Sequence, residues 1–201
     1  DAPLRFYQVH LGSWRRKPEE DHRWLSYREM ADELVDYVTD AGFSHISLLP
    51  ITEHTFDDTV GYLPSALYAP TSRYGTPDDF RYLVDTCHQA GIGVVVDWVP
   101  SFLSAEPHGL VHFDGTALYE DSDPHHSRDP DWDMPLYNLG SPAVVNYLLS
   151  NALYWLEQFH LDGLRIDSLA KLLYLDYGRG DGQWIPNKYG GNESLEALDF
   201  I

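Results

Sequence analysis

The run Leu161-Asp162-Gly163-Leu164-Arg165-Ile166-Asp167-Ser168-Leu169 has the pattern of a short buried β-strand that ends on a carboxylate. An arginine, Arg165, stands two residues before that carboxylate, Asp167. Side chains two apart on a strand point to the same side. We therefore expect Arg165 and Asp167 to lie together where the strand leaves its sheet.

A second apolar run, Ile92-Gly93-Val94-Val95-Val96-Asp97, also stops at an aspartate, and a helix-like segment precedes each run. Strands of parallel sheets are buried on both faces and are apolar throughout. Ligands bind beyond the carboxyl ends of such strands. Asp97 and Asp167 therefore predict one acidic site at the end of a parallel sheet.

Strand and helix patterns alternate along the whole chain. Strands are expected near 4–10, 43–50, 92–97 and 161–167, and capped helices begin after Ser26, Thr76 and Ser141. This order predicts an α/β fold with a parallel sheet. The segments that follow the strands, above all 51–75 and 98–140, are long and irregular, which favours a (β/α)8 TIM barrel over a doubly wound sheet. A full barrel has eight strands in about 250 residues, so residues 1–201 are expected to be an incomplete domain, the first half of a barrel with about four β/α units.

Composition limits the partners of the chain. Its 201 residues carry a formal net charge of −19, which repels nucleic acid and anionic membranes. No apolar run approaches the roughly 20 residues of a membrane span. The single cysteine, Cys87, falls on the apolar face of an expected helix, which indicates a buried side chain. One cysteine forms no internal disulfide and favours a reducing, cytoplasmic location.

Several segments of the chain carry a family resemblance. They are Tyr7-Gln8-Val9-His10-Leu11-Gly12-Ser13-Trp14, Leu49-Pro50-Ile51-Thr52-Glu53-His54, Tyr68-Ala69-Pro70-Thr71-Ser72-Arg73-Tyr74-Gly75-Thr76-Pro77, Phe113-Asp114-Gly115-Thr116-Ala117-Leu118-Tyr119-Glu120 and Trp184-Ile185-Pro186-Asn187. Through them the chain resembles the first half of the catalytic barrel of glycogen (1,4-α-glucan) branching enzymes, in glycoside hydrolase family 13.

This resemblance implies roles for four residues of the expected site. Asp167 would be the catalytic nucleophile, and Arg165 would hold that carboxylate ionised. Asp97 would bind the sugar beside the cleaved bond, and Tyr62 would be its stacking platform. The reaction implied is retaining glucan transfer, from an α-1,4 linkage of glycogen or amylose to an α-1,6 linkage. It implies no cofactor, and the ligand spacing of a metal site is absent from the sequence.

Two residues depart from the family pattern in the expected sugar site. Phe102 stands where the family has a histidine, and Leu63 stands where a glutamine follows the platform tyrosine. Phenylalanine donates no hydrogen bond. Both changes remove polar groups, so weaker binding of the transition state is expected.

The acid/base glutamate of the family has no match in residues 1–201. A retaining mechanism needs two carboxyl groups, so this chain alone is expected to be inactive. Two other functions remain open at this point. One is a degenerate α-glucan-binding module without catalysis, and the other is hydrolysis of an α-glucan or a maltooligosyl-trehalose. The sequence indicates no oligomeric state.

Overall fold

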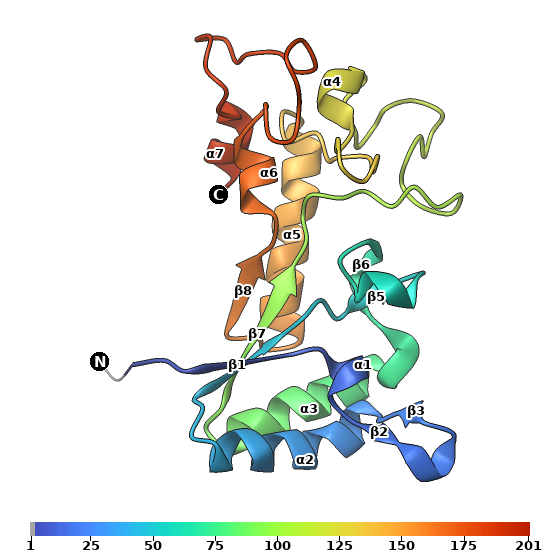
Figure 1. Cartoon of the computed structure of the whole chain (residues 1–201), viewed down its shortest axis with the longest axis vertical. Coiled ribbons are helices and arrows are strands. Elements are labelled where there is room, and N and C mark those ends of the chain that lie inside the picture. The colour runs from blue at the N-terminus through green and yellow to red at the C-terminus, as the bar shows by residue number, and fades with distance from the viewer. Residues whose placement is uncertain (1–2) are drawn as a thin grey trace.

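A computed structural model describes residues 3–201 and places a four-stranded sheet at the centre of the fold (Figure 1). The sheet contains β1 (Phe6–Val9), β4 (His45–Leu48), β7 (Gly93–Trp98) and β8 (Gly163–Ile166), in the order β1-β4-β7-β8. All three strand pairs are parallel. The four expected strands and their parallel pairing are therefore confirmed.

Three long helices connect these strands, as the alternation predicted. They are α2 (Tyr27–Asp40), α3 (Pro77–Gln89) and α5 (Pro142–Gln158). Ser26 and Glu29 form a complete capping box at the start of α2, and Thr76 and Asp79 form another at the start of α3. Such boxes satisfy backbone N–H groups that have no partner within the helix. Figure 1 shows α2 and α3 lying together, with α5 alongside β7 and β8.

The two faces of the sheet differ in chemistry. Residues in register on parallel strands share a face, and on one face these are large and apolar: Tyr7, Val9, Ile46, Leu48, Val94, Val96, Trp98, Leu164 and Ile166. This face packs on the helices, and Trp98 donates a hydrogen bond from Nε1 to Asn151 Oδ1 of α5 at 2.7 Å. Apart from Phe6 at the start of β1, the opposite face carries small and polar residues: Gln8, His45, Ser47, Gly93, Val95, Asp97, Gly163 and Arg165. It is the face that a barrel would turn inward.

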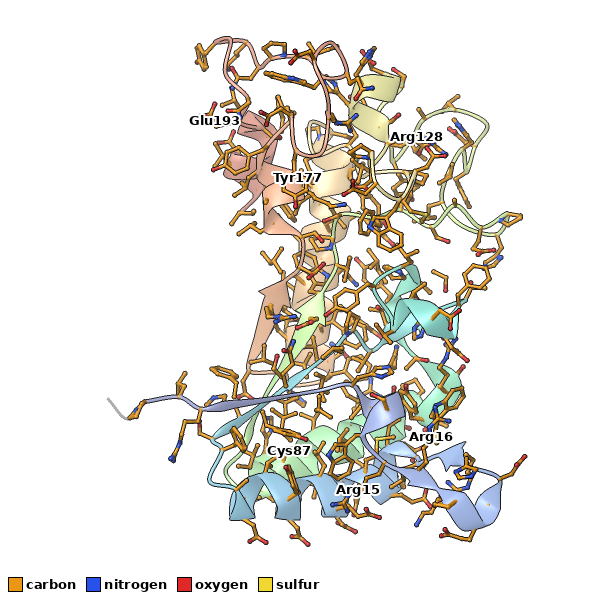
Figure 2. All side chains as sticks on the ribbon, viewed as in Figure 1. Arg15, Arg16, Cys87, Arg128, Tyr177 and Glu193 are labelled. Carbon is orange, nitrogen blue, oxygen red and sulfur yellow. The ribbon has the colours of Figure 1, made fainter. Side chains whose placement is uncertain are left out.

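The core forms between the apolar face and the helices. Its largest fully buried side chains are Trp155, Tyr27, Phe80, Phe159, Leu11, Met30, Leu34, Ile46, Leu48, Leu83, Leu103 and Leu148. Cys87 is also buried there, on α3 (Figure 2), as its position in the sequence predicted. Burial raises the pKa of its thiol to about 12, so the side chain is a small apolar filler.

Long segments leave the carboxyl ends of the strands, and short turns return at the other end. The segment after β1 contains α1 (Leu11–Trp14), the 3-10 turn η1 (Pro18–Glu20) and the hairpin of β2 (Arg16–Lys17) and β3 (Arg23–Trp24). The segment after β7 holds α4 (Pro124–Ser127), and α6 (Leu169–Leu173) and α7 (Leu195–Phe200) follow β8. This asymmetry gathers the irregular chain at one end of the sheet.

One expectation for these segments was wrong. The stretch 51–75 has no periodicity and was expected to be an irregular loop, but it folds into an antiparallel hairpin of β5 (Thr52–His54) and β6 (Pro64–Pro70). The 3-10 turn η2 (Asp57–Thr59) lies between the two strands, and the 3-10 turn η3 (Ser72–Tyr74) follows the hairpin. The pairing shifts register at two places. Bulges of this kind break the alternation by which a strand is recognised in sequence.

None of the helices among residues 3–201 is both long enough and apolar enough to cross a membrane.

The packing of α5 predicts a large difference between two adjacent leucines. Leu148 is fully buried, whereas the side chain of Leu149 is 45% exposed. Leu148→Ala is expected to lower the free energy of unfolding by about 2–5 kcal/mol, because it leaves a cavity. Leu149→Ala is expected to change it by less than about 0.5 kcal/mol. Urea denaturation of both variants measures these losses, and equal losses would contradict the packing described.

Candidate functional site

An ion pair joins the last two strands of the sheet at their carboxyl ends. Arg165 of β8 is in register with Asp97 of β7, and its Nη2 lies 2.5 Å from Asp97 Oδ2. The Asp97 side chain is 0% exposed and the Arg165 side chain 46% exposed. The hydrogen bond to Asp97 raises the pKa of Arg165. A buried carboxylate is thus balanced by a cation that reaches the surface.

The expected pair of Arg165 with Asp167 is replaced by this pair of Arg165 with Asp97. The reason is the geometry of a parallel sheet. Neighbouring strands lie about 4.8 Å apart, whereas residues two apart on one strand are separated by about 6.6 Å. The in-register partner on β7 is therefore nearer than the next residue on the same side of β8.

Tyr62 lies beside this ion pair, although it is 35 residues away from Asp97 in the sequence. Its hydroxyl donates a hydrogen bond to Asp97 Oδ2 at 2.7 Å, and Arg165 Nη2 lies 3.5 Å from the same hydroxyl. Burial raises the pKa of Tyr62, and the hydrogen bond to Asp97 and the charges of Asp97 and Asp167 raise it further. The phenol therefore stays neutral and remains a donor.

Local backbone geometry presents Tyr62 to the site. Tyr62 lies in the turn between β5 and β6, where its N–H donates to the carbonyl of Thr59 at 2.9 Å. Gly61 before it has φ +90°, and a Cβ there would stand 2.5 Å from the carbonyl oxygen of Pro50. Only glycine fits this conformation and this contact. The turn is thereby pressed against the chain that leaves β4.

Arg73 holds the base of the same turn. Its Nη1 donates to Glu53 Oε1 at 2.8 Å, and its Nε donates to Asp57 Oδ1 at 2.7 Å. The Arg73 side chain is 14% exposed. Paired carboxylates on a planar guanidinium fix its orientation, so the segment that carries Tyr62 is anchored at both ends.

Asp167 follows β8 directly and marks the point where the chain turns away. Its backbone N–H donates to the carbonyl of Trp98 at 3.1 Å, so it continues the pairing of β8 with β7. Ser168 after it has φ +56°, and the Ser168 hydroxyl donates to Asp167 Oδ2 at 2.6 Å. Asp167 is partly exposed. The structure thus brings Asp97, Arg165, Tyr62 and Asp167 to one end of the sheet.

Sequence reasoning missed one member of this group. With the Gln8 carboxamide oriented so that its oxygen faces Arg165, this oxygen accepts from Nη1 and Nη2 at 2.9 Å each. Gln8 stands on β1, at the far edge of the sheet. In the sequence, Gln8 was distinguished only by its position in one of the segments that resemble the family. The guanidinium is therefore held by partners from both β1 and β7.

Phe102 stands five residues beyond Asp97, in the segment that follows β7. It is 5% exposed and forms a bridge with Leu136. Lys171 Nζ lies 5.9 Å from the centre of its ring. Lys171 in turn binds Asp129 Oδ2 and Asp131 Oδ2, each at 2.8 Å. Phe102 thus faces a charged side chain that other residues already neutralise.

Within the 199 residues from Pro3 to Ile201, no group of three or more His, Cys, Asp or Glu side chains is arranged to hold a metal ion. The His-rich run at α4 instead makes a local contact, in which His125 Nδ1 lies 2.8 Å from Asp123 Oδ1.

Comparisons with known proteins identify the family. The model of the alpha amylase catalytic domain matches residues 31–132, which is half of the chain. The chain belongs to the alpha-amylase catalytic domain family. The 1,4-alpha-glucan branching enzyme GlgB of Paramagnetospirillum magneticum is 61% identical over the whole chain, and that of Nitrobacter hamburgensis is 58% identical. The chain covers 27% and 28% of these enzymes, so it spans about a quarter of their length. The resemblance to branching enzymes noted in the sequence is confirmed.

Solved structures agree with this membership of the alpha-amylase family. A putative alpha amylase from Salmonella typhimurium is 30% identical, with a TM-score of 0.66 over 81% of this chain and 25% of that one. The alpha-amylase of Geobacillus thermoleovorans, solved with acarbose, has the same TM-score at 20% identity, over 82% of this chain and 40% of that one, and shows likeness of fold alone. The expected α/β fold, part of a barrel, is confirmed.

Asp97 accepts hydrogen bonds from Arg165 and Tyr62, and we expect these two donors to contribute unequally to the free energy of unfolding. Arg165→Met leaves the buried Asp97 carboxylate without a cation and is expected to cost about 3 kcal/mol of unfolding free energy. Tyr62→Phe removes one neutral donor and is expected to cost about 1 kcal/mol. Urea denaturation at neutral pH compares the two variants. A larger loss for Tyr62→Phe would show that the ion pair does not dominate the site.

Proposed function

We propose that residues 1–201 form the first half of a (β/α)8 catalytic domain that performs 1,4-α-glucan branching. The observation that supports this most is 61% identity to a branching enzyme across the whole chain. The carboxyl-end cluster of Asp97, Arg165, Tyr62 and Asp167 supports it independently, because barrel enzymes of this type build their sites there. The chain transferred would be an α-1,4-glucan such as glycogen or amylose, and the acceptor would be the 6-hydroxyl of another glucan.

Each residue has a distinct role in this proposal. Asp167 attacks the anomeric carbon and forms a covalent glycosyl intermediate, while the glycosidic bond breaks and the leaving 4-oxygen takes a proton from the acid/base carboxyl group. The acceptor hydroxyl, which returns a proton to that group, then displaces Asp167 with net retention. Its partial exposure leaves the carboxylate accessible. Asp97 binds the sugar next to the cleaved bond, and Tyr62 forms the platform beside it. Arg165 supports this arrangement by pairing with the Asp97 carboxylate and holding it in place.

The mechanism also needs an acid/base carboxyl group roughly 5 Å from the nucleophile. No carboxylate in the described part of the chain matches that position in the family pattern. We therefore expect residues 1–201 by themselves to show no transfer. The proposed reaction belongs to the intact protein that contains them.

Partners and location follow from the same proposal. The solved relatives carry acarbose and, in a structure of AmyP that is 22% identical, maltotriose. An α-glucan is the partner we propose here, with no cofactor. Nucleic acid is disfavoured by the net charge of −19. A cytoplasmic location is proposed because the single cysteine is buried and forms no disulfide, as is usual for proteins of reducing compartments.

A second function is favoured by the two departures from the family pattern. Phe102 is buried and offers no hydrogen bond where the family places a histidine, and Leu63 replaces a glutamine. A module that binds α-glucan without catalysis would tolerate both changes. Hydrolysis of an α-glucan or maltooligosyl-trehalose would retain Asp167 but use water as the acceptor. Product analysis separates these possibilities.

The proposed nucleophile is tested by Asp167→Asn in the intact protein. Branching of amylose lowers iodine staining without releasing reducing sugar. The variant is expected to lose this activity by at least about a thousandfold, because no covalent intermediate forms. Asp36→Asn, at an exposed position of α2, is the matched control and should keep full activity. Release of reducing sugar by the unmodified protein would favour hydrolysis, and binding of glucan without either change would favour the module.

The effect of Phe102 and Leu63 on the rate is tested by replacing both with the residues that the family has at these positions. Phe102→His with Leu63→Gln is expected to raise the rate of transfer about tenfold or more, since it returns polar groups to the sugar site. Phe102→Leu with unchanged Leu63 keeps an apolar side chain and serves as the control. An unchanged rate in the double variant would show that these two positions do not limit catalysis.

A further inference from the structure

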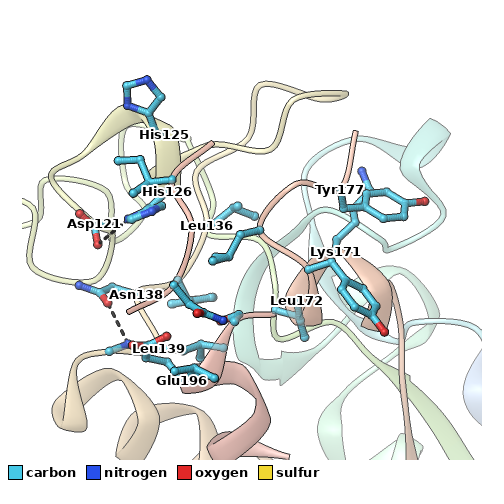
Figure 3. Close-up of a pocket in the computed structure, with 18 of the residues that line it drawn as sticks. Asp121, His125, His126, Leu136, Asn138, Leu139, Lys171, Leu172, Tyr177 and Glu196 are labelled. Carbon is cyan, nitrogen blue, oxygen red and sulfur yellow. Dashed lines mark hydrogen bonds and ion pairs between the residues drawn. The ribbon is translucent and has the colours of Figure 1, made fainter. Parts of the chain in front are cut away.

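An ion pair outside the acidic cluster joins the segment that follows β7 to the segment that follows β8. Lys171 stands on α6, four residues beyond Asp167, and Asp129 lies in the segment that follows β7. Lys171 Nζ donates to Asp129 Oδ2 and to Asp131 Oδ2, each at 2.8 Å. Figure 3 shows Lys171 beside Tyr177, and its ammonium lies 5.9 Å from the centre of that ring. The contact between Lys171 and Asp129 joins residues 42 apart in the sequence.

This ion pair is largely buried. The Asp129 side chain is 1% exposed and the Lys171 side chain 13% exposed, whereas the Asp131 side chain is 51% exposed. Burial opposes the charge of Lys171, but the hydrogen bonds to Asp129 and Asp131 raise the pKa of Lys171, so its amine stays protonated. Removal of one partner from a buried ion pair leaves an uncompensated charge. The ammonium of Lys171 is therefore needed to hold the Asp129 carboxylate where it stands.

The chain around Asp129 forms a turn, residues 129–137, that its own hydrogen bonds hold in shape. Asp129 Oδ1 accepts from the backbone N–H of Asp131 at 3.1 Å and from that of Trp132 at 2.8 Å. The N–H of Asp129 donates to the carbonyl of Met134 at 2.8 Å. One carboxylate oxygen of Asp129 thus orders the 129–137 turn, and the other binds Lys171.

Backbone hydrogen bonds join the 129–137 turn to the chain that leaves β7. The N–H of Leu103 donates to the carbonyl of Pro135 at 2.8 Å, and the N–H of Tyr137 donates to the carbonyl of Ser101 at 3.2 Å. Ser101 stands only four residues beyond Asp97. The 129–137 turn therefore has a fixed place relative to β7 and its aspartate.

On the other side of the ion pair, one helical turn separates Lys171 from Asp167. The N–H of Lys171 donates to the carbonyl of Ser168 at 2.9 Å, and the Ser168 hydroxyl donates to Asp167 Oδ2 at 2.6 Å. Helix α6 has only five residues, and helices of this length are not stable without tertiary contacts. Ser168 has φ +56°, a conformation that persists where the surrounding structure holds it. A contact that fixes α6 therefore also fixes Asp167.

We propose that Lys171 is a positioning residue for the proposed transfer: by binding Asp129, it fixes α6 against the 129–137 turn and holds the Asp167 carboxylate at a constant place relative to Asp97. The inference rests on the proposed function, because it takes the role of Asp167 from it. Constant placement matters to a nucleophile, since a displacement of about 1 Å can cost about a hundredfold in rate. Lys171 acts only through the segment that carries Asp167.

The test measures transfer by the intact protein at a temperature at which circular dichroism shows every variant to be folded. Lys171→Met keeps an unbranched side chain but removes the ammonium. It is expected to lower kcat about tenfold or more and to change the KM for amylose less than about twofold, because Asp167 shifts while Asp97 and Tyr62 stay in place. Lys171→Arg, which keeps a cation, is expected to recover most of this loss.

Lys17→Met is the matched control. Lys17 stands on β2, in the hairpin that follows β1, and β1 is the edge strand opposite β8. Its replacement removes one positive charge, as Lys171→Met does, so an effect of net charge alone would appear in both variants. The kcat and KM of Lys17→Met should equal those of the unmodified protein.

A double variant separates positioning from a loss of stability. Lys171→Met alone leaves the buried Asp129 carboxylate without its cation, which lowers the melting temperature. Lys171→Met with Asp129→Asn removes both charges and is expected to regain most of that melting temperature. Its kcat should stay low, because the contact between α6 and the 129–137 turn is still missing. Recovery of both the melting temperature and kcat overturns the inference, as does an unchanged kcat in Lys171→Met.

Hydrogen–deuterium exchange, followed by mass spectrometry on the intact protein, provides a readout that does not need transfer. The amide hydrogens of α6 are expected to exchange about tenfold or more faster in Lys171→Met and in the double variant, but not in Lys17→Met, because a lost tertiary contact permits local opening. If transfer occurs and neither kcat nor exchange changes in Lys171→Met, the positioning inference fails and the proposed function stands. If the unmodified protein shows no transfer but exchange of α6 rises in Lys171→Met, the proposed function fails and Lys171 still fixes α6.

Discussion

The register between β7 and β8 is the constraint on which the site depends. It sets Asp97 opposite Arg165, so a carboxylate that is fully buried receives its cation from the neighbouring strand. Without that cation the buried charge would be strongly destabilising. The same guanidinium lies against Gln8 of β1 when the amide is suitably oriented. Arg165 of the edge strand β8 thus contacts the other edge strand, β1, on the face of the sheet that a barrel would turn inward.

The Arg165–Asp97 ion pair lies on one face of the sheet, and the two faces therefore carry different kinds of side chain. Large apolar residues on the helix side, such as Val96 and Trp98, supply the burial that holds the helices. The other face needs small and polar residues, because charged groups must fit inside the curve of a barrel. This is why Gly163 and Ser47 stand beside Val95 in the register. The face that packs on the helices therefore contributes stability, and the opposite face of the same strands carries residues of the candidate site.

Much of the fold was predictable from sequence because local signals agreed with one another. Apolar runs gave the four strands, and the boxes at Ser26 and Thr76 gave two helix starts. The clustering of Asp97 and Asp167 followed from parallel topology. The partner of Arg165 was not predictable, because it depends on register between strands 68 residues apart in the sequence. The β5–β6 hairpin was missed because its pairing shifts register and its longer strand begins and ends with proline, and Tyr62 reaches Asp97 only through that hairpin.

The spatial order of the strands has a consequence for biosynthesis. Each strand of the central sheet pairs with the one that precedes it in the chain, because β1, β4, β7 and β8 lie side by side in the order of their synthesis. A ribosome releases the amino-terminal units first. Each newly emerged strand therefore meets an edge that is already formed, and the sheet can grow by one unit at a time without waiting for distant segments. Arg165 is synthesised after Gln8, Tyr62 and Asp97, and it completes the charge balance of Asp97.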